Sequence, residues 1–452
     1  MKVAKFGGSS LCNAAQVKKI ADIMKSDSER RIAVVSAPGK RSTGDTKVTD
    51  MLIALHANHT AGLPVEEIIT DIIGRFAAMV DELGLEHQLL ENYEGILRSH
   101  LANINEKKRL LDALKSCGED FNAQLVSAYL NKIGVDATYM CPGDAGIMVT
   151  DEPSNALLLP ESYARLEKLK DAGQVVVIPG FFGYSKSGQI VTFPRGGSDI
   201  TGAIVARAVN ASLYENFTDV SFIYSADPSR IRSPHKIEEI TYREMRELSY
   251  AGFGVFHDEA LEPVYKQNIP IMIRNTNAPE IEGTKIVAER EYTPSMPVIG
   301  ISCDEGFTSL TMNKYLMNRE VGFTRRLLQI MEDHDLSYEH IPSGIDNLSI
   351  ILRSKQFEGN DKLAAVIADI EDTLETESIH IENDLVLIII VGEGMKHHIG
   401  IATKTTVALS ENDINISMIN QGASEISMMF AVAQKDAQKA LHAIYYNYFD
   451  ES

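Results

Sequence analysis

One short stretch of the sequence, residues 192–202 (TFPRGGSDITG), places a cation, two adjacent glycines, a hydroxyl and a carboxylate side by side. We predict that a helix begins at Ser198, because serine is a preferred N-cap and an apolar-periodic segment follows it. Glycines just before a helix let an anionic ligand reach the N–H groups at its positive end. This arrangement suits a small zwitterion that carries carboxylates, although a glycine turn with a surface ion pair explains it equally well. The residues concerned are Arg195, Gly196, Gly197, Ser198 and Asp199.

The N-terminal segment is a second candidate for chemistry. A strand-like run is followed by a glycine loop (KFGGSS, residues 5–10) and by an amphipathic segment at 13–27. Strand, glycine loop and helix in this order can cradle a phosphate with backbone N–H groups. Lys5 would then lie at the end of the strand, where its charge can meet a phosphoryl group in transfer. A strand-end lysine that reaches solvent is the alternative, and the pattern alone does not decide between the two.

Two further segments contain polar groups whose role the pattern leaves open. Residues 36–47 (SAPGKRSTGDTK) imitate a P-loop in their Gly-Lys pair, but Arg41 stands where Ser or Thr is required, so we reject a Walker A motif. A mobile flap over a site and an ordinary surface loop fit this segment equally well. Residues 47–131 have an almost entirely helical pattern, in which Gly118 is expected to open another helix with Glu119 in its first turn. Acids are common in first turns merely because they suit the helix dipole.

Strands alternate with helices along most of the first two thirds of the chain. Short apolar strands are predicted at 136–140, 175–179, 189–192 and 211–217, with a helix near 161–172. We therefore predict an α/β fold whose mainly parallel sheet is sandwiched by helices and binds ligands at the carboxyl ends of its strands. The last of these strands leads into hydroxyl, carboxylate and guanidinium groups that suit a nucleotide, namely Thr218, Asp219, Tyr224 and Arg230.

Composition limits the classes of function. A chain of 452 residues with 44% apolar side chains can form two or three domains with proper cores. A formal net charge of −20 without any basic cluster argues against a nucleic-acid partner. The four cysteines are scattered and show no metal-ligand spacing, so reduced thiols are expected. Since neither a signal peptide nor a membrane-spanning stretch is apparent, we expect a soluble, cytoplasmic protein without a membrane partner.

Three motifs, in this order and at these separations, resemble the aspartate kinases of the amino-acid kinase superfamily. They are KFGGSS at 5–10, RGGSD at 195–199 and FTDVSFIYSADP at 217–228. The resemblance covers the whole chain, although the first motif alone is shared in looser form by acetylglutamate, glutamate and carbamate kinases. It implies transfer of the ATP γ-phosphoryl group to the side-chain carboxylate of L-aspartate, with Mg²⁺ screening the phosphates. The product would be 4-phospho-L-aspartate, in the first step of lysine, threonine and methionine biosynthesis.

The resemblance also implies a role for each matched position. Lys5 would stabilise the phosphoryl group in flight, and Asp199 would orient Lys5 or the substrate ammonium. Arg195 would clamp a substrate carboxylate, and Glu119 would hold the substrate ammonium. The other matched substrate positions are Ser36, Thr49, Gly196 and Ser198, and those on the ATP side are Gly7, Gly8, Ser9, Thr218, Asp219, Tyr224 and Arg230. No metal ligand is assigned to the protein itself.

A carboxylate acceptor is already ionised at neutral pH, so this transfer needs no general base. Positioning and charge neutralisation must therefore supply most of the rate. One departure bears on this. Many aspartokinases carry a lysine near the ATP phosphates in a segment that here reads GFGVFH (252–257), with Gly254 in its place. Compensation by Arg230, Arg232 or Lys236 and weaker ATP binding both remain open, and His257 is expected to be structural.

An internal repeat occupies the region beyond Pro297. Gly322 is matched by Gly400 and Asp335 by Asp413, an offset of 78 residues in each case. Self-similarity at a fixed offset indicates two copies of one structural unit. Each copy has the order strand, helix, strand, strand, helix, which is ferredoxin-like. A strand near 378–381 closes the first copy, and we infer that a strand at 298–302 completes the second.

Paired units of this kind resemble ACT domains, so we expect two βαββαβ units after the kinase domain. The predicted boundaries are 1–296 for the kinase domain, 303–382 for the first, inserted ACT unit, and 297–302 plus 383–452 for the second. The resemblance implies feedback by an amino acid, and the acidic Glu339 favours lysine over threonine. The expected effector residues are Asn318, Gly322, Phe323, Ser337, Glu339 and Ser343. Exposed sheet edges in this region predict a homodimer and leave a tetramer open.

Two other functions remain as alternatives at this stage. One is a different amino-acid kinase of the glutamate type, which would keep Lys5 and the glycine loops. The other is a catalytically impaired amino-acid sensor, in which Gly254 marks lost activity.

Overall fold

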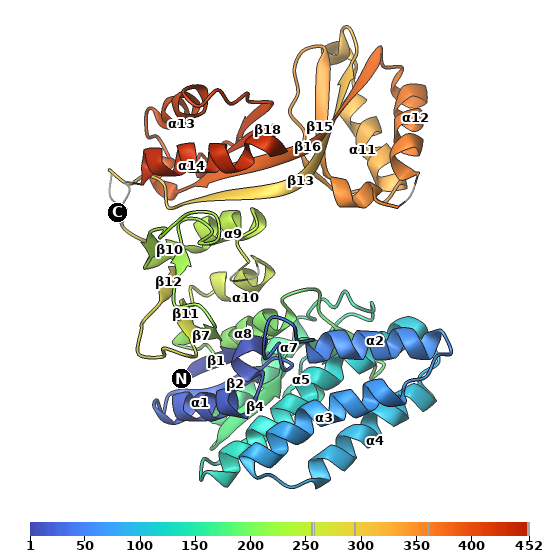
Figure 1. The fold of residues 1–452 in the computed structure, drawn as a ribbon, viewed down its shortest axis with the longest axis vertical. Helices are drawn as coiled ribbons and strands as arrows, with labels where there is room; N and C mark the ends of the chain where they lie inside the picture. Colours follow the sequence, from blue (N-terminus) through green and yellow to red (C-terminus); the bar gives the residue numbers. More distant parts are fainter. Residues whose placement is uncertain (255, 257, 293–294, 360, 450–452) are drawn as a thin grey trace. The chain divides into compact units, whose positions relative to one another are not determined.

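The computed structural model describes residues 1–254, 256, 258–292, 295–359 and 361–449, and His257 lies outside them. The chain forms two compact units (Figure 1). Two short segments from the region predicted as kinase domain, Tyr224–His235 and Tyr250–Phe253, pack with the second unit. The first unit comprises Met1–Ile223, Lys236–Ser249 and Gly254–Arg290, and the second also contains Glu291–Ser452.

An eight-stranded sheet forms the centre of the first unit, in the order β10-β12-β11-β7-β1-β2-β4-β3. All neighbouring strands run parallel except β11 and β12, which confirms the mainly parallel sheet. Its middle strands are buried almost throughout because helices cover them, as their continuous apolar runs predict. The strands are β1 (Lys2–Phe6), β2 (Arg30–Val35), β3 (Ala137–Tyr139), β4 (Val175–Pro179), β7 (Leu213–Thr218), β10 (Glu239–Thr241), β11 (Ile271–Asn275) and β12 (Thr284–Val287).

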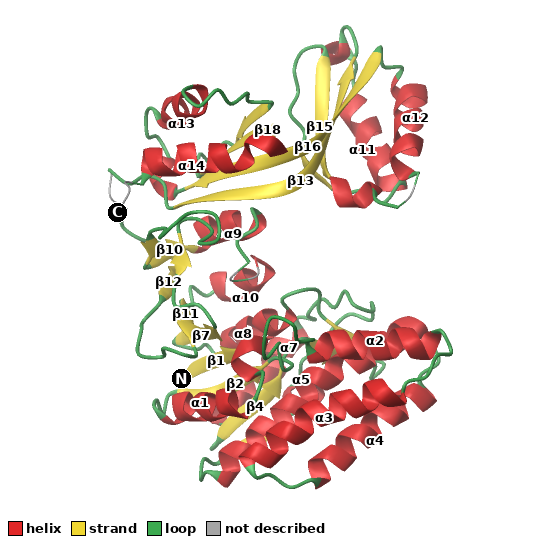
Figure 2. Cartoon of the chain, viewed as in Figure 1, coloured by secondary structure: helices red, strands yellow, loops and turns green. Residues whose placement is uncertain are grey.

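Helices occupy most of the remaining chain of this unit (Figure 2). The helical pattern predicted for 47–131 is confirmed as four helices, α2 to α5. The side chain of Asn13 caps α1 by accepting from the N–H of Gln16 at 3.0 Å. The helices are α1 (Ala14–Lys25), α2 (Val48–Thr60), α3 (Glu66–Leu83), α4 (Gln88–Asn103), α5 (Lys107–Lys132), α6 (Pro142–Ala145), α7 (Glu161–Leu166), α8 (Gly197–Ala208), α9 (Tyr242–Tyr250) and α10 (Leu261–Tyr265).

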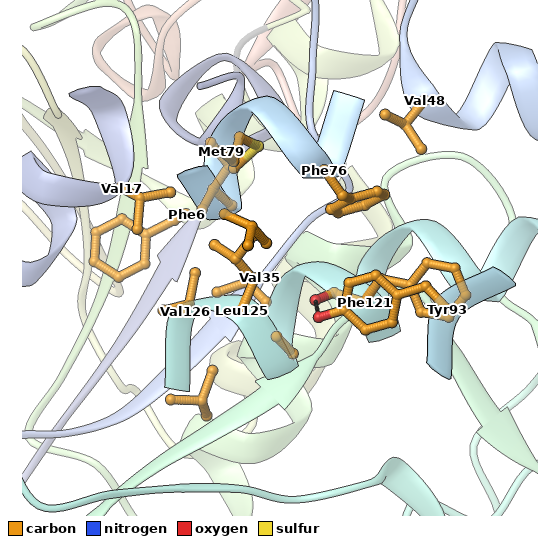
Figure 3. Close-up of a cluster of buried hydrophobic side chains, with 14 of the residues drawn as sticks. Phe6, Val17, Val35, Val48, Phe76, Met79, Tyr93, Phe121, Leu125 and Val126 are labelled. Atoms are coloured by element: carbon orange, nitrogen blue, oxygen red, sulfur yellow. Dashed lines mark hydrogen bonds between the residues drawn. The ribbon is translucent and has the colours of Figure 1, made fainter. Parts of the chain in front are cut away.

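A large apolar cluster packs α1 to α5 against the sheet, and Figure 3 shows part of it. Phe76 of α3, Tyr93 of α4 and Phe121 of α5 meet there. The rings of Tyr93 and Phe121 stack with centroids 4.2 Å apart, and Phe76 lies edge-on to both. The Tyr93 hydroxyl donates to the carbonyl of Phe121 at 2.8 Å, so this buried polar group is satisfied. The cluster fixes the position of α5 on the sheet.

The structure corrects two predicted helix starts. Helix α5 runs unbroken from Lys107 to Lys132, so Gly118 opens no helix and Glu119 is not in a first turn. A Cβ on Gly118 would lie 2.8 Å from the Cβ of Ala37, so this glycine serves close packing. Helix α8 begins at Gly197, and its N-cap is Gly196 in the left-handed conformation (φ 82°). The prediction that Ser198 caps this helix is therefore wrong, because the glycine turn already brings the chain into the helix one residue earlier.

Two short strand pairs stand apart from the large sheets. The strand predicted at 189–192 does form, but it lies outside the parallel sheet and pairs antiparallel with a neighbouring strand in a hairpin. The elements are β5 (Phe182–Tyr184) with β6 (Ile190–Thr192), and β8 (Ile223–Tyr224) with β9 (Lys236–Ile237).

The second unit contains a six-stranded sheet in the order β14-β15-β13-β16-β18-β17, with every neighbouring pair antiparallel. Two separate apolar cores lie on it, one with α11 and α12 and one with α13 and α14. The strands are β13 (Gly300–Asn313), β14 (Tyr338–His340), β15 (Asn347–Arg353), β16 (Ser378–Val391), β17 (Met418–Gln421) and β18 (Ser427–Ala433). The helices are α11 (Phe323–Asp333), α12 (Lys362–Leu374), α13 (Ile401–Ser410) and α14 (Ala437–Tyr448).

Strands β13 and β16 belong to both repeats. Their pairing runs from Gly300 with Val391 to Asn313 with Ser378, and its register shifts near Gly306. Only the first half of β13 lies beside the part of β16 that pairs with β18, so the strand expected at 298–302 lies in the sheet of the second repeat.

The internal repeat is visible in the backbone as well. Gly322 and Gly400 cap α11 and α13 with φ of 83° and 101°. Asp335 and Asp413, 78 positions apart, both have φ of 53°. The two copies therefore use the same turns to start and end their first helices.

Candidate functional site

Lys5 lies near the carboxyl end of β1, and only 7% of it is exposed. Its Nζ atom is 2.5 Å from Oδ1 of Asp199, in the first turn of α8. Asn216, which faces Lys5 across the parallel β1–β7 pairing, donates from Nδ2 to the same Asp199 oxygen at 2.7 Å. Oδ1 of Asn216 is 3.5 Å from the Lys5 nitrogen. The lysine does not reach into bulk solvent. Two side chains hold it at the carboxyl ends of the central strands.

The glycine loop after β1 makes close backbone contacts. A Cβ on Gly39 would lie 2.6 Å from the carbonyl carbon of Gly8, and the Gly39 N–H donates to the Gly8 oxygen at 2.9 Å. The glycine of the rejected P-loop is thus explained by a crossing of two loops. The N–H of Gly7 already donates to Phe217 at 3.0 Å. Gly8 and Ser9 open a short 3-10 helix, whose first N–H groups have no partner within that helix and suit phosphate oxygens.

The sequence did not decide whether segment 36–47 is a mobile flap or an ordinary surface loop. In the structure this segment is anchored at its base. Arg75 of α3, which is buried, donates from Nη2 to the Gly39 carbonyl at 2.8 Å and from Nη1 to Asp45 at 2.8 Å. The hydrogen bonds from Arg41 and the charge of Arg75 hold the pKa of the Asp45 carboxyl well below its usual range. At the two ends of this segment, Ser36 follows β2 directly and Thr49 lies in the first turn of α2, both half-buried.

Glu119 is a buried acid in the middle of α5. Its Oε2 atom has no hydrogen-bond partner within the described residues. Burial raises the pKa of its carboxyl to about 8, partly offset by a hydrogen bond from the backbone of Ala37 and by the charge of Lys115. To ionise a buried carboxyl group with one oxygen left without a partner is costly, which is typical of a site prepared for a cationic ligand.

Asn122 lies one turn further along α5, and its position parallels that of Glu119. Its Nδ2 atom donates to the Ser36 carbonyl at 2.7 Å, while its Oδ1 atom has no partner among the described residues. Both side chains therefore hold the start of segment 36–47, and each retains an unused acceptor. Two such acceptors one turn apart suit a ligand that donates several hydrogen bonds, such as an ammonium group.

The remaining substrate positions surround the start of α8. Arg195 is exposed, and the described part of the chain offers it no ion pair, so this cation is available to a ligand. A Cβ on Gly180 would overlap Ser198, at 2.7 Å from its Cβ, so Ser198 packs against a strand end and does not cap the helix. Phe181, the next residue, has φ of 77°, which is strained for a bulky side chain.

The positions expected on the ATP side are divided between the two units. In the first unit Thr218 ends β7, and its hydroxyl donates to the exposed Asp219 at 3.2 Å. In the second unit Tyr224 ends β8 and is half-buried. Arg230, also in the second unit, is engaged by Glu305 at 2.6 Å and by the sulfur of Cys303 at 3.3 Å. Around Gly254 a Cβ would meet no atom within 4 Å, so the space beside this position is open.

The expected effector residues lie in the first repeat. Gly322 and the buried Phe323 form the start of α11. The N–H of Asn318 donates to the Ile345 carbonyl at 3.2 Å, which links this turn to the loop that contains Ser343. Ser337 donates to Gln356 at 3.1 Å.

Glu339 is already engaged in this structure. It accepts from Nε of Arg353 at 3.0 Å and from the Tyr250 hydroxyl. An effector ammonium at Glu339 would therefore compete with these two groups.

Several functional candidates were not found from the sequence. They are Asn216, Asn122, Phe181 and Lys115, whose Nζ atom lies 3.2 Å from Asp112 and 5.4 Å from the ring centre of Phe181. For Asn216 a signal existed, because an amide directly beside an acid in an apolar strand (LYENFT) needs a buried partner.

No helix of the described residues is both long and apolar enough to cross a membrane. Nor do the described residues contain a group of three or more His, Cys, Asp or Glu side chains placed to hold a metal ion.

Comparison with known proteins gave concordant results. The model of the amino acid kinase family matches residues 1–275, and a model of the ACT domain matches residues 388–448. The chain is 49% identical to aspartokinase 3 of Bacillus subtilis over 450 residues, which is 99% of each chain. The crystal structure of Clostridium acetobutylicum aspartate kinase is 36% identical and superposes with a TM-score of 0.88, over 99% of this chain and 100% of the other.

Aspartokinase III of Escherichia coli has been solved in two complexes that resemble this chain. Both are 25% identical and cover 100% of each chain. The complex with aspartate and ADP has a TM-score of 0.79, and the complex with lysine and aspartate has one of 0.74.

Proposed function

This chain belongs to the amino acid kinase family and, within it, to the aspartokinases, and on that premise we propose how its own residues carry out and regulate the reaction. The enzyme is an ATP-dependent aspartate kinase, which transfers the terminal phosphoryl group of ATP to the side-chain carboxylate of L-aspartate. The glutamate-type alternative and the impaired sensor have no comparable support.

The observation that carries the substrate assignment is the buried Glu119 side chain, whose Oε2 atom has no hydrogen-bond partner among the described residues. We assign to it the ammonium of aspartate, because an ammonium supplies both the charge and the hydrogen bonds that this group lacks. Asn122 offers a second acceptor in the adjacent turn. Arg195, which is exposed and free of ion pairs within the described residues, is assigned to a substrate carboxylate. Ser36, Thr49, Gly196 and Ser198 are proposed to complete this side of the site.

Lys5 is proposed as the charge that meets the phosphoryl group in transfer. Its ammonium is held by Asp199 and Asn216, so no side-chain reorganisation is required when charge develops on the phosphoryl oxygens. The N–H groups of Gly8 and Ser9 are the proposed phosphate donors, with Gly7 shaping the turn. Thr218, Asp219, Tyr224 and Arg230 are proposed for the nucleotide.

Mg²⁺ is the proposed companion of ATP in this reaction. Mg²⁺ usually binds through substrate phosphates and only one or two carboxylates and retains several waters. Of the acids assigned to the site, Asp199 is paired with Lys5, Glu119 is assigned to the ammonium, and Asp219 is exposed on the nucleotide side. A metal that arrives on the ATP phosphates fits this donor set. When bound, it would neutralise charge on the phosphates.

A substrate panel tests the assignment. ADP release is measured with ATP and Mg²⁺ and, in turn, L-aspartate, L-glutamate or N-acetylglutamate. We expect turnover with aspartate only, and in Glu119→Gln a KM for aspartate raised about tenfold or more, since a charged hydrogen bond is lost. Equal use of glutamate would contradict specificity for aspartate, and an unchanged KM in Glu119→Gln would refute the role of Glu119.

For regulation we propose that L-lysine binds the first repeat, at Asn318, Gly322, Phe323, Ser337, Glu339 and Ser343. The support is the open glycine turn at Gly322 and the acidic Glu339. Asn318→Ala should weaken inhibition by lysine, whereas Lys396→Ala, at the matching position of the second repeat, should not. Inhibition by L-threonine alone, or equal effects of the two substitutions, would contradict this site.

We also propose that the two ACT units, 303–382 and 297–302 plus 383–452, mediate a homodimer. The six-stranded sheet that the two ACT units share ends in β14 and β17, which have no strand on their outer side among the described residues. Ile419 of β17 is 52% exposed. Sedimentation of Ile419→Lys should shift toward monomer. A wild-type chain that sediments as a monomer would refute the dimer, and a larger assembly would decide for the tetramer.

A further inference from the structure

The first unit contains a cavity that the reaction described above does not use. Its volume is about 580 Å³, within the roughly 300–1,000 Å³ of small-molecule sites. It lies among α8, α9 and α10 and the segment that leads into α7. The apolar part of its lining includes Leu158, Phe193, Ile200, Ile204, Leu261 and Pro263.

Charged groups of both signs line this cavity. Arg243 and Arg246 lie one turn apart on α9 and are exposed. Glu259 contributes an exposed carboxylate to the same lining. Within the described residues none of these three makes an ion pair or hydrogen bond, whereas Glu262 nearby is paired with Lys266.

We propose that this cavity binds a free α-amino acid with an apolar side chain. The α-carboxylate would pair with Arg243 and Arg246, the α-ammonium with Glu259, and the side chain would fill the apolar lining. Aspartate and lysine are excluded, because each would place a second charge in the apolar part of the cavity. The ligand is therefore neither the substrate nor the effector proposed for the first repeat.

Helix α8 connects this cavity with the catalytic centre. Ile200 lines the cavity, and the preceding residue, Asp199, binds Lys5. A ligand that shifts Ile200 and Ile204 also moves the carboxylate that orients Lys5. Occupancy of the cavity therefore changes kcat, a consequence that rests on the proposed function, whereas the binding itself does not.

Calorimetric titration of the full-length protein with L-leucine and L-phenylalanine tests the binding. We expect saturable uptake of at least one of them. 3-Phenylpropanoate, which lacks the ammonium, and 2-phenylethylamine, which lacks the carboxylate, should bind about tenfold or more weakly than phenylalanine.

Two variants and a control locate the site. The double variant Arg243→Gln/Arg246→Gln should lose affinity about tenfold or more, and Leu158→Trp should abolish uptake by filling the cavity. Arg165→Gln, which removes an exposed arginine outside the lining, should bind normally.

The outcomes separate this proposal from the proposed function. Absence of saturable uptake at millimolar concentrations, or uptake unchanged in both variants, would overturn the cavity as an amino-acid site. Uptake that is lost in both variants, in a protein that fails to phosphorylate aspartate, would support the cavity and count against the proposed function alone.

Discussion

The Nζ atom of Lys5 lies 2.5 Å from Oδ1 of Asp199, so the cation and the carboxylate act as one unit. Asp199→Asn should lower kcat at least about a hundredfold, as loss of one preorganised charge contact typically does, and so should Lys5→Ala. Because Asp199 works through Lys5, the double variant should be about as slow as Lys5→Ala alone. ADP release measures all three. Effects that multiply, or a near-normal rate in Lys5→Ala, would contradict this relationship.

Asn216 is predicted to be a positioning residue, since it contacts both members of the pair. Asn216→Leu keeps the number and branching of the side-chain heavy atoms but removes both polar contacts, so we expect kcat to fall about tenfold while the KM for aspartate changes little. Asn103→Leu, at an exposed helix end, is the matched control. A purely structural role would instead lower the thermal midpoint without this split between kcat and KM.

Glu119 makes substrate binding depend on pH. In the unliganded protein the pKa of its carboxyl is raised to about 8, so the group is largely protonated at neutral pH. Binding of an ammonium requires the ionised form, so aspartate should release nearly one proton per molecule bound, and its KM should fall as pH rises toward about 8. Titration calorimetry in buffers of different ionisation enthalpy counts the protons. Proton release that persists in Glu119→Gln would exclude this assignment.

The same group affects the stability of the unliganded protein, with the opposite trend. The folded pKa is above the unfolded value of 4.5, so the stability contribution is complete below that value and is lost as pH rises to about 8. The difference of about 3.5 units corresponds to up to about 5 kcal/mol. The thermal stability of Glu119→Gln should therefore fall less than that of the wild type between about pH 5 and pH 8. Parallel pH profiles would refute the shift.

Gly39 is predicted to be required for the crossing of two loops. A Cβ there would lie 2.6 Å from the Gly8 carbonyl carbon, so Gly39→Ala should displace the glycine loop, destabilise the protein by about 1–3 kcal/mol and raise the KM for ATP. Gly44→Ala in the same segment should be neutral, because no atom lies within 4 Å of its Cβ. Thermal unfolding and ATP kinetics distinguish the two, and equal behaviour would count against the crossing.

Gly254 leaves room for the side chain that many relatives carry. We expect Gly254→Lys to lower the KM for ATP about fivefold, as a partly exposed charge contact would, and Gly254→Ala to change nothing. Steady-state kinetics with varied ATP provide the comparison. An unchanged KM in Gly254→Lys would show that other groups already neutralise the phosphates.

The sequence predicted the parallel sheet and the doubled ACT unit, and its motifs singled out Lys5 as the proposed catalytic lysine, because periodicity and motifs are local properties of the chain. Gly118 was expected to open a new helix, yet it lies inside α5 and allows close contact with Ala37, which is distant in sequence. Gly39 likewise imitated part of a P-loop in the sequence, yet in the structure it allows close contact with Gly8, which is also distant in sequence. Ser198 has the residue type of a cap, but the left-handed turn at Gly196 starts the helix first. Such long-range approaches leave no periodic pattern in the sequence.

The continuity of β13 and β16 has a consequence for the evolution of the regulatory region. The chain leaves the sheet of the second repeat at Glu305 and returns at Val386, and these two residues pair with each other. The first repeat is therefore a cassette whose ends already meet across two neighbouring strands. A single in-frame exchange can replace it with a relative of different ligand preference, whereas the second repeat, divided between two distant stretches of the gene, cannot be exchanged in one event.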